Sequence, residues 1–110
     1  MKPTKMHVPQ DIQEILVLLS WILLKSPRFI QKGRYLQPVS VEYVFSRLKE
    51  GLSNVRETLG EERYRELTRM SDEMYAHFKA DPENTTGETR KGRDIIYEME
   101  DILKQVRRKS

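Results

Sequence analysis

The sequence contains no cysteine, which excludes disulfide bonds, thiolate metal sites and cysteine nucleophiles. It also lacks a long apolar run. The longest such stretch, residues 15–24, is about half of the roughly 20 residues that a membrane-spanning helix needs. Asp11 and Glu14 precede this stretch, and acidic residues there argue against a signal peptide. We therefore expect a cytoplasmic protein without a membrane span.

Acidic residues are absent from residues 15–41, which carry four cations, whereas residues 42–103 are rich in acids and residues 104–109 are basic again. The formal net charge is only +3. Two small basic zones around an acidic middle do not form the profile of a strongly basic nucleic-acid binder.

The length of 110 residues is that of one domain. Hydrophobic residues make up 37% of the chain and charged residues 34%, which indicates an ordinary core beneath a heavily charged surface. We expect a flexible leader over residues 1–8 and a single helical domain over residues 9–108.

The clearest helix is expected over residues 41–59, where apolar residues recur with a 3.6-residue period. Ser40 is a favourable N-cap for this helix, and Gly60 is a favourable residue to end it. Gly51 lies inside the segment and flanks its apolar stripe, so we expect it to let a neighbouring helix approach.

Two more helices are expected over residues 61–80 and 86–108, each with one apolar stripe. Asp81, followed by proline, closes the first, and Thr85 with Glu88 forms a capping-box pattern for the second. With a helix from Pro9 to Ser26, the segments predict an all-α, antiparallel four-helix bundle. Its one long loop, residues 27–39, follows the first helix.

The first helix is apolar on two opposite faces, which a single bundle seam cannot cover. The stripes of the other helices are expected to converge on one face, formed by Ile12, Ile15, Leu16, Leu19 and Leu23. The opposite face carries Val17, Leu18, Trp21 and Leu24. Either the loop or another chain must cover this second face, and the sequence leaves both open.

The candidate partner-binding surface combines the second face with aromatic residues of the loop. Its members are Val17, Leu18, Trp21, Leu24, Phe29 and Tyr35. Tryptophan is enriched at interface hot spots, which favours a partner. The sequence thus predicts a non-catalytic protein-binding module, an adaptor, regulator or inhibitor-like protein that binds another protein or itself as a homodimer.

Nucleic-acid binding is the rival prediction. Residues 25–36 interleave cations with aromatic residues, a composition that contacts phosphates and stacks on bases. The candidate contacts are Lys25, Arg28, Lys32 and Arg34. In the alternative interpretation these cations are only the solvated rim of a loop that covers the first helix.

Catalytic and metal-binding patterns are weak. Residues 61–66 followed by residues 98–101 loosely resemble the EExxE…ExxD pattern of all-α nucleotide pyrophosphohydrolases, which hold Mg²⁺ between two helices. The first motif has one residue too many, and Asp101 lies almost opposite the apolar stripe of its helix. His77 follows Glu73 by one helical turn, but a metal site needs further ligands. We predict no enzyme, no metal and no cofactor.

Overall fold

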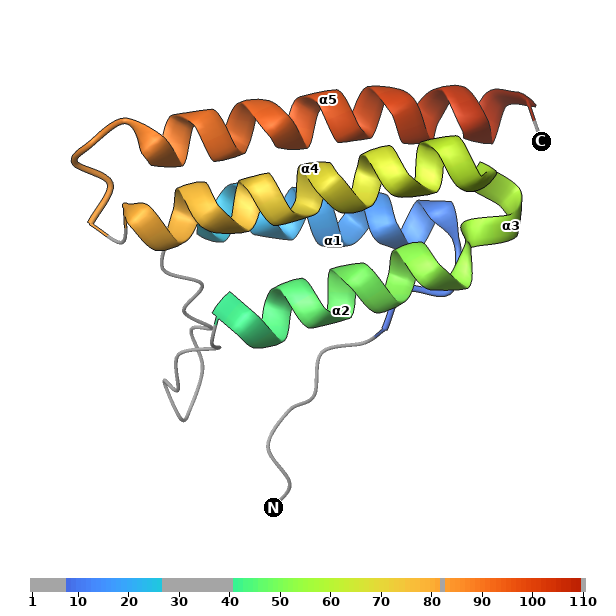
Figure 1. Ribbon diagram of the computed structural model, residues 1–110, viewed down its shortest axis with the longest axis horizontal. Coiled ribbons are helices and arrows are strands. Elements are labelled where there is room, and N and C mark those ends of the chain that lie inside the picture. The colour runs from blue at the N-terminus through green and yellow to red at the C-terminus, as the bar shows by residue number, and fades with distance from the viewer. Residues whose placement is uncertain (1–7, 27–40, 82, 110) are drawn as a thin grey trace, which may run out of the picture.

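All regular structure in residues 8–26, 41–81 and 83–109, the part of the chain that the computed structural model describes, is helical (Figure 1). The helices pack together around one continuous core. They are α1 (Ile12–Lys25), α2 (Val41–Asn54), α3 (Arg56–Leu59), α4 (Glu61–Ala80) and α5 (Glu88–Lys109). The predicted all-α class is confirmed for these residues. The predicted leader and the loop over residues 27–39 lie outside them, except for Val8.

Helix α1 begins at Ile12, three residues after the expected start at Pro9, because Asp11 is its N-cap. The Asp11 carboxylate accepts a hydrogen bond from the backbone N–H of Glu14 at 2.9 Å, and the Glu14 side chain accepts one from the backbone N–H of Gln10 at 2.8 Å. This reciprocal arrangement satisfies two backbone donors and places negative charge at the positive end of the helix.

The single helix expected over residues 41–59 is divided at Val55 into α2 and α3. At this residue the backbone N–H is shared between the carbonyl oxygens of Gly51, at 3.3 Å, and Leu52, at 3.2 Å. The hydrogen-bond ladder therefore slips between its i−4 and i−3 partners, which breaks the helix. The helix was expected to end at residue 59, and α3 does end at Leu59. Gly60 follows it with a φ of 84°, a backbone conformation that favours glycine.

Contacts between the helices show which of them are neighbours. The Asn54 side chain donates to the backbone carbonyl of Pro9 at 2.8 Å, which ties the end of α2 to the start of α1. Helix α4 packs against α2 and α5, and α1 lies behind α4 in the view of Figure 1, also packed against α2 and α5.

The core is formed almost entirely by the predicted stripes. Leu48, Leu67 and Met99, from α2, α4 and α5, are each completely buried. Gly92 of α5 makes room for the Phe78 ring of α4, because an added Cβ would lie 2.6 Å from that ring. Gly51 also permits a close approach, but its neighbour is Pro9, in the segment before α1, and not a helix.

The start of α5 is built differently from the predicted capping box. Asp81, at the end of α4, is almost completely buried, and its carboxylate accepts hydrogen bonds from the backbone N–H groups of Thr85, Thr86 and Thr89 at 2.7, 3.1 and 3.0 Å. The Thr89 hydroxyl also donates to the Asp81 carbonyl. Asp81 thus caps the helix that follows it, a role that the sequence pattern gave to Thr85.

Burial raises the pKa of the Asp81 carboxyl, but the backbone hydrogen bonds from Thr89, Thr85 and Thr86 lower it by more, to about 2 from its usual 3.8. The folded structure therefore favours the charged carboxylate, which also lies at the positive end of α5.

Candidate interaction face on helix α1

The outward side of α1 presents an exposed stripe without charge. Gln13, Val17, Ser20 and Leu24 recur at spacings of three and four residues and share one side of the helix, and we call these four residues the α1 stripe. Val17 is 61% exposed and Leu24 77% exposed. Apolar side chains at this exposure contribute little burial to the fold of the described chain.

Two other predicted members of the surface lie deeper. Leu18 is buried in the core, with 8% of its surface exposed. Trp21 is half-buried and packs against the core cluster at the edge of the stripe. The predicted second face is therefore narrower than expected, because Leu18 belongs to the core and Trp21 packs against it.

Helix α5 extends the exposed apolar surface. The Arg107 guanidinium donates to the Gln13 side chain, and the Arg93 guanidinium donates to the Ser26 hydroxyl at 3.0 Å and to the Ser26 carbonyl at 2.9 Å. These contacts show that α1 and α5 run in opposite directions. Tyr97 shares this side of α5, since it follows Arg93 by one turn, and it comes level with the last turn of α1.

Tyr97 is 54% exposed. Val17, Leu24 and Tyr97 are thus the strongly exposed large hydrophobic residues of the described chain, and they belong to two adjacent helices. The sequence analysis missed Tyr97 because it lies outside the apolar stripe of its own helix. Only the pairing of α1 with α5 brings it level with the last turn of α1, which carries Leu24.

Charge is separated along α1. Asp11 and Glu14 lie at its first turn and Lys25 at its last. Glu14, Trp21 and Lys25 are each half-buried, and their spacing of seven and four residues places them on one flank of the α1 stripe. One end of this flank is acidic and the other basic.

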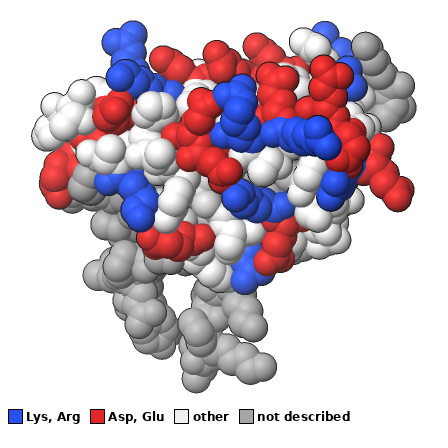
Figure 2. Space-filling view, viewed as in Figure 1, with Lys and Arg blue, Asp and Glu red and all other residues white. Residues whose placement is uncertain are grey.

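The face of the molecule in the view of Figure 2 has a different character. Lys and Arg side chains alternate with Asp and Glu over α4 and α5. Ion pairs such as Lys49–Asp72, at 2.7 Å, and Arg69–Glu73 cross or follow these helices at the surface. Exposed pairs of this kind contribute little to stability, and they mark a solvated face.

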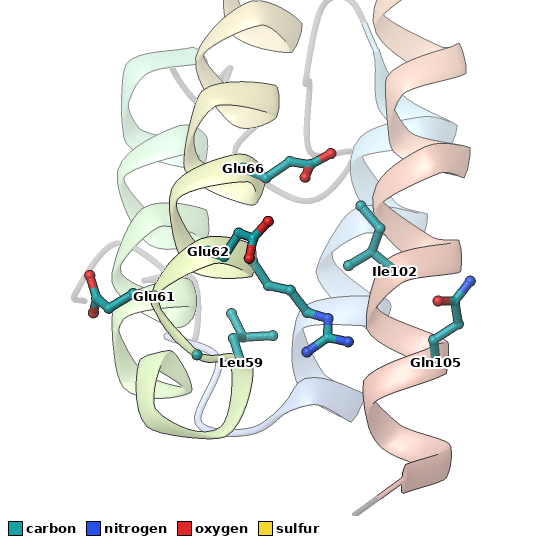
Figure 3. A pocket seen from close by; sticks show the side chains of 8 residues that line it. Leu59, Glu61, Glu62, Glu66, Ile102 and Gln105 are labelled. Atoms are coloured by element: carbon teal, nitrogen blue, oxygen red, sulfur yellow. The ribbon is translucent and has the colours of Figure 1, made fainter.

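A hollow of about 540 Å³ lies where the end of α3 and the start of α4 face α5. Its walls combine acidic residues of α4 with apolar and polar side chains (Figure 3). The lining residues are Leu59, Gly60, Glu61, Glu62, Arg63, Glu66, Ile102 and Gln105.

The carboxylates at this hollow do not converge as metal ligands. Glu61 points to the far side of α4 from Glu66 (Figure 3), and it accepts hydrogen bonds from Arg56 at 2.5 and 2.9 Å. The hydrogen bond from Arg56 lowers the pKa of Glu61. Glu98 and Asp101 are exposed on α5 and do not line the hollow. Within the three described ranges no cluster of His, Asp and Glu could hold a metal ion.

Millimolar Mg²⁺ or Mn²⁺ should therefore leave the melting temperature unchanged, because only a ligand that prefers the folded state stabilises it. Thermal unfolding followed by circular dichroism, with and without metal, measures this. A saturable rise at low metal concentration would contradict the expectation and revive the pyrophosphohydrolase interpretation.

The remaining predicted site residues, Phe29, Tyr35, Arg28, Lys32 and Arg34, lie outside the described residues. Lys25 is the one candidate nucleic-acid contact that is described, and it is half-buried at the end of α1. Among the helices that the structure describes, none combines the length and apolarity needed to cross a membrane. Comparison with protein-family models, curated proteins and solved structures finds no match to this chain.

Proposed function

We propose that the protein is a non-catalytic binding module that recognises another protein, or a second copy of itself, through the α1 stripe and the adjoining Tyr97 side chain. The scaffold in this proposal is an antiparallel four-helix bundle of α1, α2, α4 and α5, with α3 as a short corner between α2 and α4. The exposed pair Val17 and Leu24 carries the proposal, because both project from a helix whose other large apolar side chains are at least half-buried.

The chemistry of this face suits an apolar helix of a partner. Val17 and Leu24 are two turns apart, so they form two anchors on one line, with the small Ser20 between them. Full burial of a Val or Leu side chain contributes about 1.5–3 kcal/mol. The α1 stripe and the Tyr97 side chain together offer a surface that one amphipathic helix of a partner can cover.

Charge placed on the stripe tests this proposal. Val17→Glu combined with Leu24→Glu should abolish partner binding while the melting temperature changes by less than about 3 °C, since both side chains are exposed. Partners captured from an extract of the native cell would be compared by mass spectrometry between the parent protein and this variant, and circular dichroism would confirm the fold.

A matched control adds the same charge elsewhere. Ser53→Glu combined with Ala76→Glu changes two exposed positions on α2 and α4 and should retain every partner of the parent. If the α1 variant keeps the partners that the control keeps, the stripe is not the binding surface and the proposal is wrong.

A further inference from the structure

We infer that the α1 stripe binds a second copy of this chain, with the two α1 helices packed antiparallel about a twofold axis near Ser20. This inference rests on the proposed function, and it names the partner. The described surface supports it in three ways: the spacing of the exposed residues, the absence of charge on the stripe, and the opposite charges at the two ends of α1.

Spacing comes first. Val17 lies three residues before Ser20, and Leu24 lies four residues after it. When a second α1 is reversed and centred between Ser20 and Trp21, its Leu24 comes opposite Val17, and its Val17 comes opposite Leu24. The small Ser20 side chains meet near the axis, where packed helices approach most closely. This is the self-complementary arrangement that a twofold dimer requires.

Charge decides the direction of the second helix. In a parallel pair, the flank that carries Glu14 and Lys25 would lie on opposite sides of the interface in the two copies, so no opposite charges would meet. In the antiparallel pair, Lys25 instead approaches the acidic first turn of the other α1, which carries Asp11 and Glu14. This happens twice about the axis, and the two helix dipoles also oppose each other. The α1 stripe itself has no charge to desolvate.

The interface is small. Three exposed apolar anchors per copy give less contact than the roughly 800 Å² per partner of a stable complex. We therefore expect a dimer that dissociates on dilution, with a dissociation constant on the order of 10–100 µM. Trp21 is the only tryptophan and borders the stripe, so its emission should shift to shorter wavelength as the concentration rises through this range.

Charge reversal provides the first test. Lys25→Glu and Glu14→Lys should each weaken self-association at least tenfold, because each places like charges together at both ends of the helix pair. An equimolar mixture of the two variants should form a heterodimer as tight as the parent dimer, since every contact in it is again between opposite charges. Sedimentation equilibrium of the full chain measures the dissociation constants of the two variants and of their mixture, for comparison with the parent.

Cross-linking provides a second test that does not depend on charge, and the absence of native cysteine makes it clean. Under mild oxidation Ser20→Cys should form a covalent dimer, because the two positions lie near the axis. Val17→Cys alone should remain uncross-linked, whereas a mixture of Val17→Cys and Leu24→Cys should form a covalent dimer. Ser53→Cys, exposed on α2, is the matched control and should remain monomeric.

A strict monomer at 500 µM, or equal cross-linking of the Ser20→Cys and Ser53→Cys variants, would overturn the inference. If that monomer loses a captured partner on Val17→Glu and Leu24→Glu substitution, a different protein occupies the stripe and the proposed function stands. If the monomer loses nothing, both the inference and the proposed function fail. Cross-linking of Val17→Cys to itself would show a parallel pair and also overturn the inference.

Discussion

Leu48→Ala should lower the free energy of unfolding by about 2–5 kcal/mol. Leu48 lies in the middle of α2 with its side chain completely buried in the core. Truncation removes apolar contacts and leaves a cavity that neighbouring helices can fill only in part. Urea unfolding followed by circular dichroism measures the loss as a lower transition midpoint with an unchanged slope.

Leu24→Ala is the matched control, because it makes the same chemical change on an exposed side chain. Leu24 is 77% exposed, so its truncation should change the free energy of unfolding of the monomer by less than about 0.5 kcal/mol. The measurement is made well below the concentration at which self-association is expected. Equal losses of unfolding free energy in the two variants would contradict the finding that Leu48 is buried and Leu24 is exposed.

The helices could be predicted because their signals are local. Apolar residues at a period of 3.6 mark the buried sides of α2, α4 and α5, and Gly60 lies where α3 ends. The centre of each stripe is fixed by this period alone. Residues at the stripe edges, such as Ile95 and Ile102, are only half-buried, since their exposure depends on how far the neighbouring helices extend.

The division at Val55 and the cap at Asp81 could not be predicted, because both depend on contacts between segments. Asn54 is tied to Pro9, 45 residues away, beside the point where α2 ends. The Asp81 carboxylate reaches the Thr89 N–H only after the chain has turned between α4 and α5. A capping box is recognised from the three residues that follow the cap. It therefore could not identify Asp81, which lies eight residues before the Thr89 N–H that it caps.

The candidate site was only partly predictable for the same reason. Period and composition placed Val17 and Leu24 on a second apolar side of α1, but they also placed Leu18 there. Ile22, which is completely buried, belonged to neither predicted stripe. The buried arc of α1 is wider than one stripe, because helices on both of its sides cover it, and only their packing shows which residues remain outside.

Asp81→Asn should lower the melting temperature at pH 7 by roughly 5–10 °C. The amide can still accept hydrogen bonds through its oxygen, but its NH₂ group cannot accept from Thr89, and the negative charge at the start of α5 is lost. Asp94→Asn is the control, because Asp94 is exposed on α5, and it should change the melting temperature by less than about 2 °C.

The difference between the parent protein and Asp81→Asn should also depend on pH in a defined direction. The pKa of Asp81 is about 2 in the folded protein and ordinarily 3.8, so the carboxylate contributes stability that is complete above about pH 4 and is lost as the pH falls through 2. Other carboxyl groups titrate equally in both proteins. The gap between the two melting temperatures should therefore be constant from pH 7 to pH 5 and narrow between pH 4 and pH 2. A gap that stays the same down to pH 2 would show that Asp81 does not cap α5 as a carboxylate.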